Sequence, residues 1–192
     1  MKSQSSDVVV VSEIKNDKKR LSRSHLYFLY FIIFAFLGWV LETFYSLYEL
    51  GHFTNRGFLY GPLCPIYGFG SLILIIYFSK YKKENLKLFF YATIIFTVFE
   101  YIVSYGMDSL FAAKWWDYTN EFFNLNGRVS IFYSFAWGIT AILFTNFIFP
   151  FFEKKVNVIL SKIPYNVQKI IIYIFTVVLL VDNIMSFVKY LA

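Results

Sequence analysis

Five apolar segments, each close to the length that crosses a lipid bilayer, constrain the fold of this chain more than any other feature. They lie at approximately residues 26–49, 59–79, 86–107, 128–149 and 167–190. A helix rises 1.5 Å per residue, so about 20 apolar residues cross the ~30 Å hydrocarbon core. The mean hydropathy of +0.57 excludes an ordinary soluble domain. We therefore expect an all-α, multi-pass bundle of about five transmembrane helices over residues 26–192, in the cell membrane with the lipid bilayer as its surroundings.

The basic residues are divided unevenly between the connections, and this division predicts the orientation of the chain. With the N-terminus inside, fourteen Lys and Arg residues fall on the inner side and four on the outer side. Inner loops of membrane proteins carry the excess of Lys and Arg. The sequence therefore predicts the N-terminus inside and the C-terminus outside. The four outer basic residues are Arg56, Lys114, Arg128 and Lys189.

The polar ends and loops exclude several classes of function. Residues 1–25 are charged and poor in apolar side chains, so we expect a mobile basic cytoplasmic tail. The net charge of +6 lies in this tail and in short loops rather than on a folded face, so no nucleic-acid partner is expected. One cysteine and two histidines offer no metal-ligand spacing, and neither a metal nor another cofactor is expected.

Three acidic residues fall at one predicted depth in the membrane. Glu42, Glu100 and Asp182 each lie seven or eight residues before the outer end of a segment, which is roughly 10–12 Å along a helix. The long side chains of Arg56 and Arg128 can reach the same layer from the outer loops. A carboxylate in lipid costs about 2.5–3.5 kcal/mol. We therefore predict an outward-side acid/arginine cluster that binds a small polar or lipid-like solute. The structural alternative is a salt bridge between Glu42 and Arg56.

Small and hydroxylated residues recur at helical spacing and predict which faces point into the bundle. Such residues let membrane helices approach closely. The fourth segment carries the stripe Ser130, Ser134, Gly138, Ala141 and Thr145, and the first carries Ala35, Gly38, Glu42, Ser46 and Glu49.

The segment 57–70, with four glycines and two prolines, interrupts the helical pattern. Proline removes backbone donors, so we expect an unwound entry to the second helix. Such an entry serves either as a tight turn between two packed helices or as a backbone-lined solute site. The aromatic outer loop 108–127 has the composition of an interfacial belt or of a lid.

Four strings carry a resemblance to a known family: GWVLE at 38–42, NRGFLYGPLCPIYGFG at 55–70, WWDY at 115–118 and FNLNGRVS at 123–130. Together they resemble the bacterial membrane proteins of the putative ABC-transporter type IV permease family, over roughly residues 26–150. The resemblance implies a permease subunit with a separate ATPase subunit, because this chain lacks a GxxxxGK[ST] sequence. Beside the charged cluster, the matching positions expected to matter are Asn55, Cys64, Pro65, Trp116, Asp117 and Asn126.

These patterns favour a membrane transport protein over an enzyme. No nucleophile and base pair is evident, so no catalytic residues are expected. Five short helices enclose little volume, so we expect a homo-oligomer or a hetero-complex. Two alternatives are a non-transporting accessory protein that uses the same charges structurally, and an intramembrane enzyme whose Arg56 and Arg128 hold a lipid phosphate.

Overall fold

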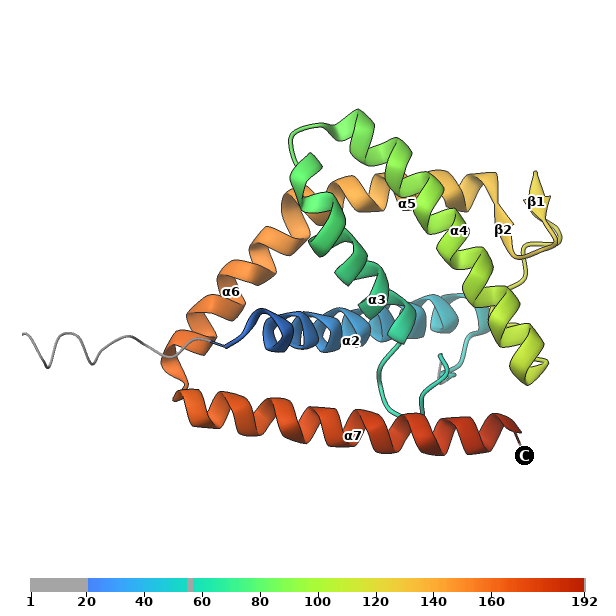
Figure 1. The fold of residues 1–192 in the computed structure, drawn as a ribbon. Coiled ribbons are helices and arrows are strands. Elements are labelled where there is room, and N and C mark those ends of the chain that lie inside the picture. The colour runs from blue at the N-terminus through green and yellow to red at the C-terminus, as the bar shows by residue number, and fades with distance from the viewer. Residues whose placement is uncertain (1–20, 55–56, 192) are drawn as a thin grey trace, which may run out of the picture.

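The computed structural model describes residues 21–54 and 57–191, and these are mostly helical (Figure 1). Four helices are long and apolar enough to cross a membrane, which confirms the all-α class. Three of them are uninterrupted: α2 (Arg23–Leu50), α4 (Asn85–Phe111) and α7 (Tyr165–Leu191). The fourth joins α5 (Ile131–Leu143) to α6 (Phe149–Lys162) through the π-helical turn η3 (Phe144–Ile148). Residues 1–20 of the predicted tail lie outside the described residues.

The second apolar segment begins later than residue 59, so its predicted start is wrong. It consists of α3 (Pro65–Ile73), the π-helical turn η1 (Leu74–Phe78) and the 3₁₀ turn η2 (Ser79–Tyr81). Residues 57–64 form the expected unwound entry, because Pro62 and Pro65 supply no N–H for helical bonds. The stretch 65–81 is roughly 25 Å long by helical rise, which is short for a crossing.

The fourth segment also differs from its predicted limits of 128–149. A hairpin of β1 (Asn124–Leu125) and β2 (Val129–Ser130) precedes the helix. Asn126 and Gly127 adopt φ values of 56° and 67°, the left-handed backbone that an Asn-Gly hairpin turn requires. At its other end the helix runs on to Lys162. Pro150 is the second residue of α6, which follows η3 directly, and a missing donor is tolerated in the first turn of a helix.

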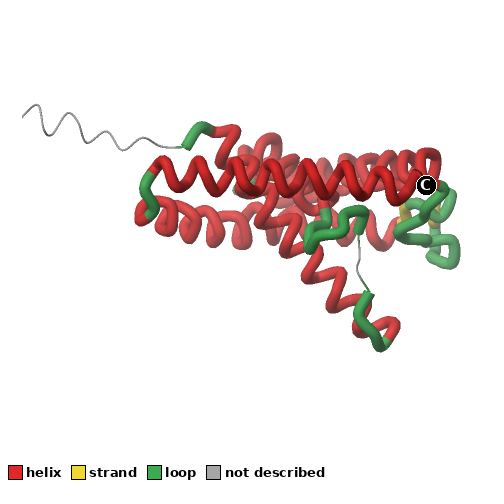
Figure 2. The backbone as a smooth tube through the Cα atoms, turned by 90° about the horizontal axis from the view of Figure 1, so that it is seen from below, coloured by secondary structure: helices red, strands yellow, loops and turns green. Residues whose placement is uncertain are grey.

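Consecutive long helices alternate in direction. In Figure 1, α2, α4 and α7 run one way, whereas α3 and the joined α5 and α6 run back. The loops 51–54 and 57–64, the hairpin and the end of α7 lie toward the same end of the bundle in both views (Figures 1 and 2). This end carries the residues of the predicted cluster.

Glycines and other small residues set the closest helix contacts, between α2 and α3 and between α4 and α5. The entire stripe predicted on the fourth segment, from Ser130 to Thr145, is buried, so that inward face is confirmed. A Cβ atom at Gly38 would collide with the ring of Tyr67, and one at Gly138 would collide with Thr93 and Phe89. These helices therefore touch where a side chain is missing.

Helix α7 is the least buried of the long apolar helices. It runs beside α2 (Figure 1). Near its start, the Gln168 side chain donates hydrogen bonds of 2.8 Å to the Leu160 and Ile163 carbonyl oxygens at the end of α6. Its remaining apolar face is exposed, which fits a surface that contacts lipid.

Candidate functional site

Glu100 lies on the buried face of α4, and its side chain is only 3% exposed. The Trp137 indole N–H donates a hydrogen bond of 3.0 Å to Oε2, and the Tyr118 hydroxyl donates one of 3.1 Å to Oε1. Within the described part of the chain, no cation lies within 4 Å of this carboxylate. The donors that hold the Glu100 side chain in this part of the chain are both neutral.

Glu42 joins the same network from α2. The Tyr67 hydroxyl on α3 donates a hydrogen bond of 2.5 Å to its Oε1 atom. The Tyr67 ring centre lies 6.5 Å from that of Trp137, the residue that binds Glu100. Four helices thus bring the two acids into one group of aromatic side chains.

A cavity of about 360 Å³ opens between α2, α3, α4 and α5 beside this network. Among the described residues that line the cavity, Glu100 is the one with a charged side chain. Tyr67 and Trp137 also line it. Most of the other lining residues are apolar, among them Phe96 and Phe99. The cavity volume falls in the usual range for small-molecule sites, about 300–1,000 Å³.

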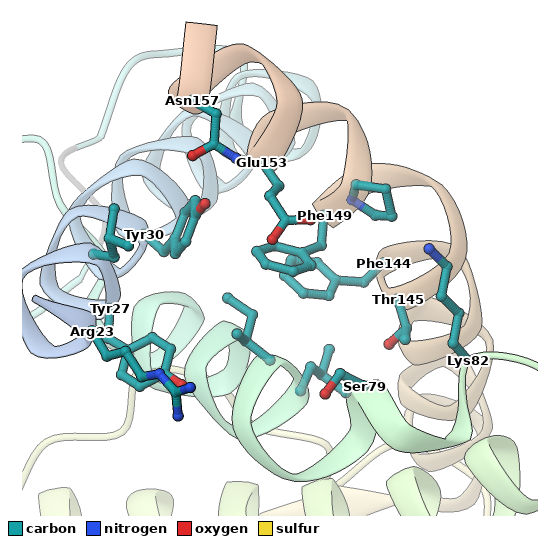
Figure 3. Close-up of a pocket in the computed structure, with 14 residues that line it drawn as sticks. Arg23, Tyr27, Tyr30, Ser79, Lys82, Phe144, Thr145, Phe149, Glu153 and Asn157 are labelled. Atoms are coloured by element: carbon teal, nitrogen blue, oxygen red, sulfur yellow. The ribbon is translucent and has the colours of Figure 1, made fainter. Parts of the chain in front are cut away.

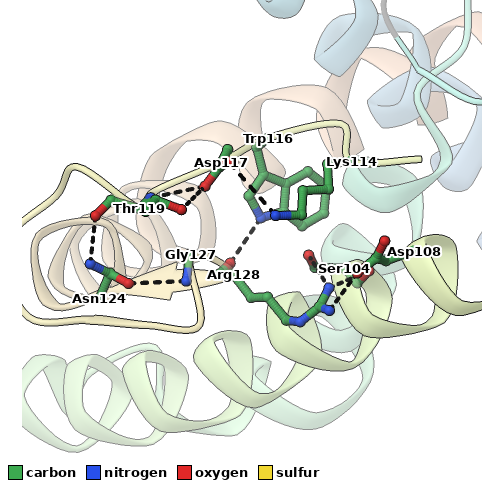
Figure 4. Close-up of polar contacts among 9 residues, drawn as sticks. All are labelled: Ser104, Asp108, Lys114, Trp116, Asp117, Thr119, Asn124, Gly127 and Arg128. Carbon is green, nitrogen blue, oxygen red and sulfur yellow. Dashed lines mark hydrogen bonds and ion pairs between the residues drawn. The ribbon is translucent and has the colours of Figure 1, made fainter. Parts of the chain in front are cut away.

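Arg128 does not form an ion pair with Glu42 or Glu100, although the sequence predicted that it would reach their layer. Its Nη2 atom lies 2.6 Å from the Asp108 carboxylate (Figure 4). Its Nη1 atom donates to the Ser104 carbonyl oxygen at 3.1 Å and to the Ser104 hydroxyl at 3.3 Å. Ser104 and Asp108 follow Glu100 by one and two turns of α4, so the hairpin aims the guanidinium at the outer end of that helix.

The other motif residues of the loop hold the loop itself. The Trp116 indole N–H donates to the Arg128 carbonyl oxygen at 2.9 Å (Figure 4). Asp117 accepts hydrogen bonds from the hydroxyl and the backbone N–H of Thr119, and these lower the pKa of its carboxyl. Asn126 donates to the Tyr101 hydroxyl at 3.0 Å.

This folded loop places Tyr118 against Glu100. The Tyr118 ring stacks on Tyr133, with the ring centres 4.3 Å apart. Burial raises the pKa of the Tyr118 phenol well above its ordinary value, and the nearby Glu100 carboxylate raises it further. The phenol therefore stays protonated and remains a hydrogen-bond donor.

Asp182 contacts the unwound entry to α3 rather than an arginine. Its carboxylate accepts hydrogen bonds of 2.9 Å from the backbone N–H groups of Tyr60 and Gly61. Cys64 is buried, and its N–H donates to the Ala35 carbonyl oxygen at 2.9 Å, while Pro65 is the first residue of α3. Asn55 and Arg56 lie outside the described residues.

A family model described as putative ABC-transporter type IV matches residues 29–187. The chain belongs to this family. The match extends to residue 187 in the fifth apolar segment, which the sequence motifs had not covered. The comparisons with curated proteins and with solved structures found no match. Membership of the putative ABC-transporter type IV family, together with the four long apolar helices, makes this a membrane protein of a transport family.

Sequence reasoning had not assigned a role to three aromatic residues of this type IV family member. They are Tyr67, Tyr118 and Trp137, which bind the two acids. Tyr67 and Tyr118 lie within two of the strings that carried the family resemblance, NRGFLYGPLCPIYGFG at 55–70 and WWDY at 115–118. Those strings were therefore the available signal for both tyrosines, whereas Trp137 had none.

Proposed function

We propose that this chain is the membrane subunit of a transport system and that a cationic, partly apolar solute binds beside Glu100. The observation that carries the proposal is a buried carboxylate on the wall of an apolar cavity, whose hydrogen-bond donors within residues 21–54 and 57–191 are neutral. A buried charge is costly unless an opposite charge or a proton accompanies it. A solute with a positive charge would supply that partner.

The aromatic lining favours the same class of solute. Tyr67, Phe96, Phe99 and Trp137 surround the cavity, and the faces of aromatic rings attract cations. An organic ammonium ion offers both a charge for Glu100 and apolar surface for the rings. This narrows the predicted small polar or lipid-like solute to an amine or a quaternary ammonium compound.

The test is binding of tetraethylammonium to the purified chain in detergent, with Glu100→Gln as the variant. Gln keeps the size of the side chain and an acceptor for Trp137, so the fold is expected to persist. We expect affinity to fall by about tenfold or more, as for loss of one charge-assisted contact. Glu121→Gln, which changes an exposed loop acid, is the matched control. Equal binding by wild type and Glu100→Gln would refute the proposal.

We also propose five crossings with the N-terminus inside and the C-terminus outside. The alternation of helix direction (Figure 1) and the uneven distribution of Lys and Arg support this topology. Cys64 is buried, so an impermeant thiol reagent is expected to label it slowly. In a Cys64→Ser background, Glu121→Cys should react from outside in intact cells, whereas Lys83→Cys should not. The reverse pattern would overturn the orientation.

A separate ATPase subunit would supply the energy, because the chain contains no nucleotide-binding GxxxxGK[ST] sequence. Copies of this chain or a second membrane subunit would complete the path of the solute through the membrane. Much of the apolar surface of α7 is exposed and could contact such a subunit. Purification of a tagged chain from its native membrane in mild detergent tests both partners. Recovery of a monomer without an ATPase would contradict this part of the proposal.

The accessory alternative has its own supporting observation. Arg128 and Asp182 both serve contacts that hold the fold, with Asp108 and with the entry to α3 respectively. An accessory protein would lose partner co-purification when its outer loop is changed, whereas Glu100→Gln would leave that co-purification intact. In a transport subunit, by contrast, Glu100→Gln would weaken solute binding.

A further inference from the structure

A second cavity, of about 380 Å³, lies at the opposite end of the bundle from the hairpin. It is enclosed by the first turns of α2, by η1 and η2, and by η3 and α6 (Figure 3). The buried side chains that line it include the apolar Leu74 and Phe144. Its polar members are Arg23, Tyr27, Tyr30, Ser79, Lys82, Thr145, Glu153 and Asn157.

Thr145 presents an unused donor to this cavity. The residue is 4% exposed, and its hydroxyl has no hydrogen-bond partner among the residues that the structure describes. Threonines in helices commonly donate to the carbonyl four residues back, as Thr97 and Thr176 do here at 2.7 and 2.8 Å. Thr145 lies in the π-helical turn η3 instead, and Figure 3 shows its oxygen directed into the cavity.

The charges around the rim are also unpaired. Arg23 and Lys82 lie on opposite sides of the cavity, and Glu153 lies on a third side (Figure 3). Between residues 21 and 191, leaving out 55–56, none of the three forms an ion pair within 4 Å. Two cations and one acid therefore face a space that also contains a buried, unpartnered hydroxyl.

We propose that this cavity binds a phosphodiester that also carries an ammonium group, the chemistry of a phosphoethanolamine headgroup. Arg23 and Lys82 attract the phosphate, toward which the Thr145 hydroxyl donates a hydrogen bond. Glu153 pairs with the ammonium group. A purely anionic ligand would leave this acid without a partner. Long Lys and Arg side chains at helix ends reach the headgroup level of a membrane.

The apolar depth of the cavity selects a lipid over a free headgroup. Leu26, Leu74 and Phe149 also line the cavity and are less exposed than its charged residues. Acyl chains would find contact with these apolar side chains. This site is independent of the proposed function. None of its charged or hydroxyl-bearing residues lines the cavity beside Glu100, where the cationic solute is proposed to bind.

The test measures binding of dioctanoyl phosphatidylethanolamine to the purified full chain in detergent. Thr145→Val keeps the shape and removes only an unpaired hydroxyl, so folding is expected to be unaffected. We expect Thr145→Val to weaken binding by about fivefold, and Arg23→Gln with Lys82→Gln together by about tenfold or more. Lys83→Gln, which changes an exposed lysine outside the cavity, is the control and should bind as wild type does.

Two further probes separate the parts of the ligand. Dioctanoyl phosphatidylglycerol lacks the ammonium group, so wild type should bind it at least fivefold more weakly than the phosphatidylethanolamine. The variant Glu153→Gln should bind the two lipids equally. Glycerophosphoethanolamine lacks acyl chains: weak competition supports a lipid, and full competition supports the same chemistry in a soluble ligand. Unchanged binding in Thr145→Val and in the double variant, or equal binding of the two lipids by wild type, would overturn the proposal.

Discussion

The Asp182 carboxylate accepts a hydrogen bond of 2.9 Å from the backbone N–H of Gly61, 121 residues earlier in the chain. The same carboxylate accepts a second bond of 2.9 Å from the N–H of Tyr60. The two bonds attach the last helix, α7, to the unwound entry of α3. Both N–H groups lie before the first residue of α3, so Asp182 supplies the acceptor that carbonyl oxygens provide within a regular helix.

Removing this acceptor should loosen the entry to α3. We expect Asp182→Ala to lower the free energy of unfolding by about 1–3 kcal/mol, since two backbone donors lose their partner. The buried Cys64 thiol should also react faster with a maleimide in detergent. Asn183→Ala is the matched control, because the Asn183 side chain donates to the Leu179 carbonyl oxygen of its own helix. Equal effects of the two substitutions on melting temperature and labelling rate would contradict this role.

The contact between α2 and α3 depends on Gly38. A Cβ at this position would collide with the Tyr67 ring, so Gly38→Ala should destabilise the protein by about 1–3 kcal/mol and displace the Tyr67 hydroxyl from Glu42. A Cβ at Gly106 on α4 would meet no atom within 4 Å. Gly106→Ala should therefore be neutral or stabilise by up to about 1 kcal/mol. Thermal unfolding in detergent compares the two, and similar losses would argue against close packing at Gly38.

The ion pair between Arg128 and Asp108 should couple energetically. Their side chains are 14% and 31% exposed, and Arg128 also donates hydrogen bonds to Ser104. A double-mutant cycle with Arg128→Gln and Asp108→Asn should give a coupling energy of about 1–3 kcal/mol. The exposed pair Lys87 and Glu84, with side chains 60% and 45% exposed, should give less than about 0.5 kcal/mol. Equal couplings would mean that burial does not strengthen the first pair.

The Asp117 and Thr119 contact should make the outer loop sensitive to acid. Bonds from Thr119 lower the pKa of Asp117 below its ordinary value of 3.8, so the ionised form stabilises the folded loop. This stabilisation is complete above the ordinary pKa and disappears as the pH falls through the lowered one. Tryptophan fluorescence should therefore change below about pH 4. Thr119→Val should shift that change to higher pH, whereas Thr119→Ser should not; an unshifted curve in Thr119→Val would disprove the link.

The long helices and the inward face of the fourth segment could be predicted because lipid imposes a length and packing imposes a stripe of small residues. The stripe predicted on the first segment was wrong at its end, because Glu49 is exposed. The stripe from Ser130 to Thr145 is buried as expected, and α7 is a long apolar helix as predicted. The boundaries failed where local hydrogen bonding decides them. Pro65 delays the start of α3, and the Asn-Gly turn at 126–127 forms a hairpin in place of the first helical residues. That turn was a recognisable signal.

The partners of the charged residues could not be predicted from depth alone. Helical rise placed Glu42, Glu100 and Asp182 in one layer, but depth does not fix the direction in which a side chain points around the helix axis. Arg128 therefore contacts Asp108, two turns beyond Glu100, and Asp182 contacts a backbone loop. Trp137 reaches Glu100 from a different helix, and its involvement depends on how α4 and α5 pack.

The two π-helical turns, η1 and η3, contact each other, and their first residues, Leu74 and Phe144, line both cavities. A π-helical turn contains one residue more than the α-helical turn it replaces, so the side chains on either side of it point in different directions from those of a regular helix. Each turn therefore contributes one side chain to the walls of both cavities, and a change of size at Leu74 or Phe144 would alter both cavities at once.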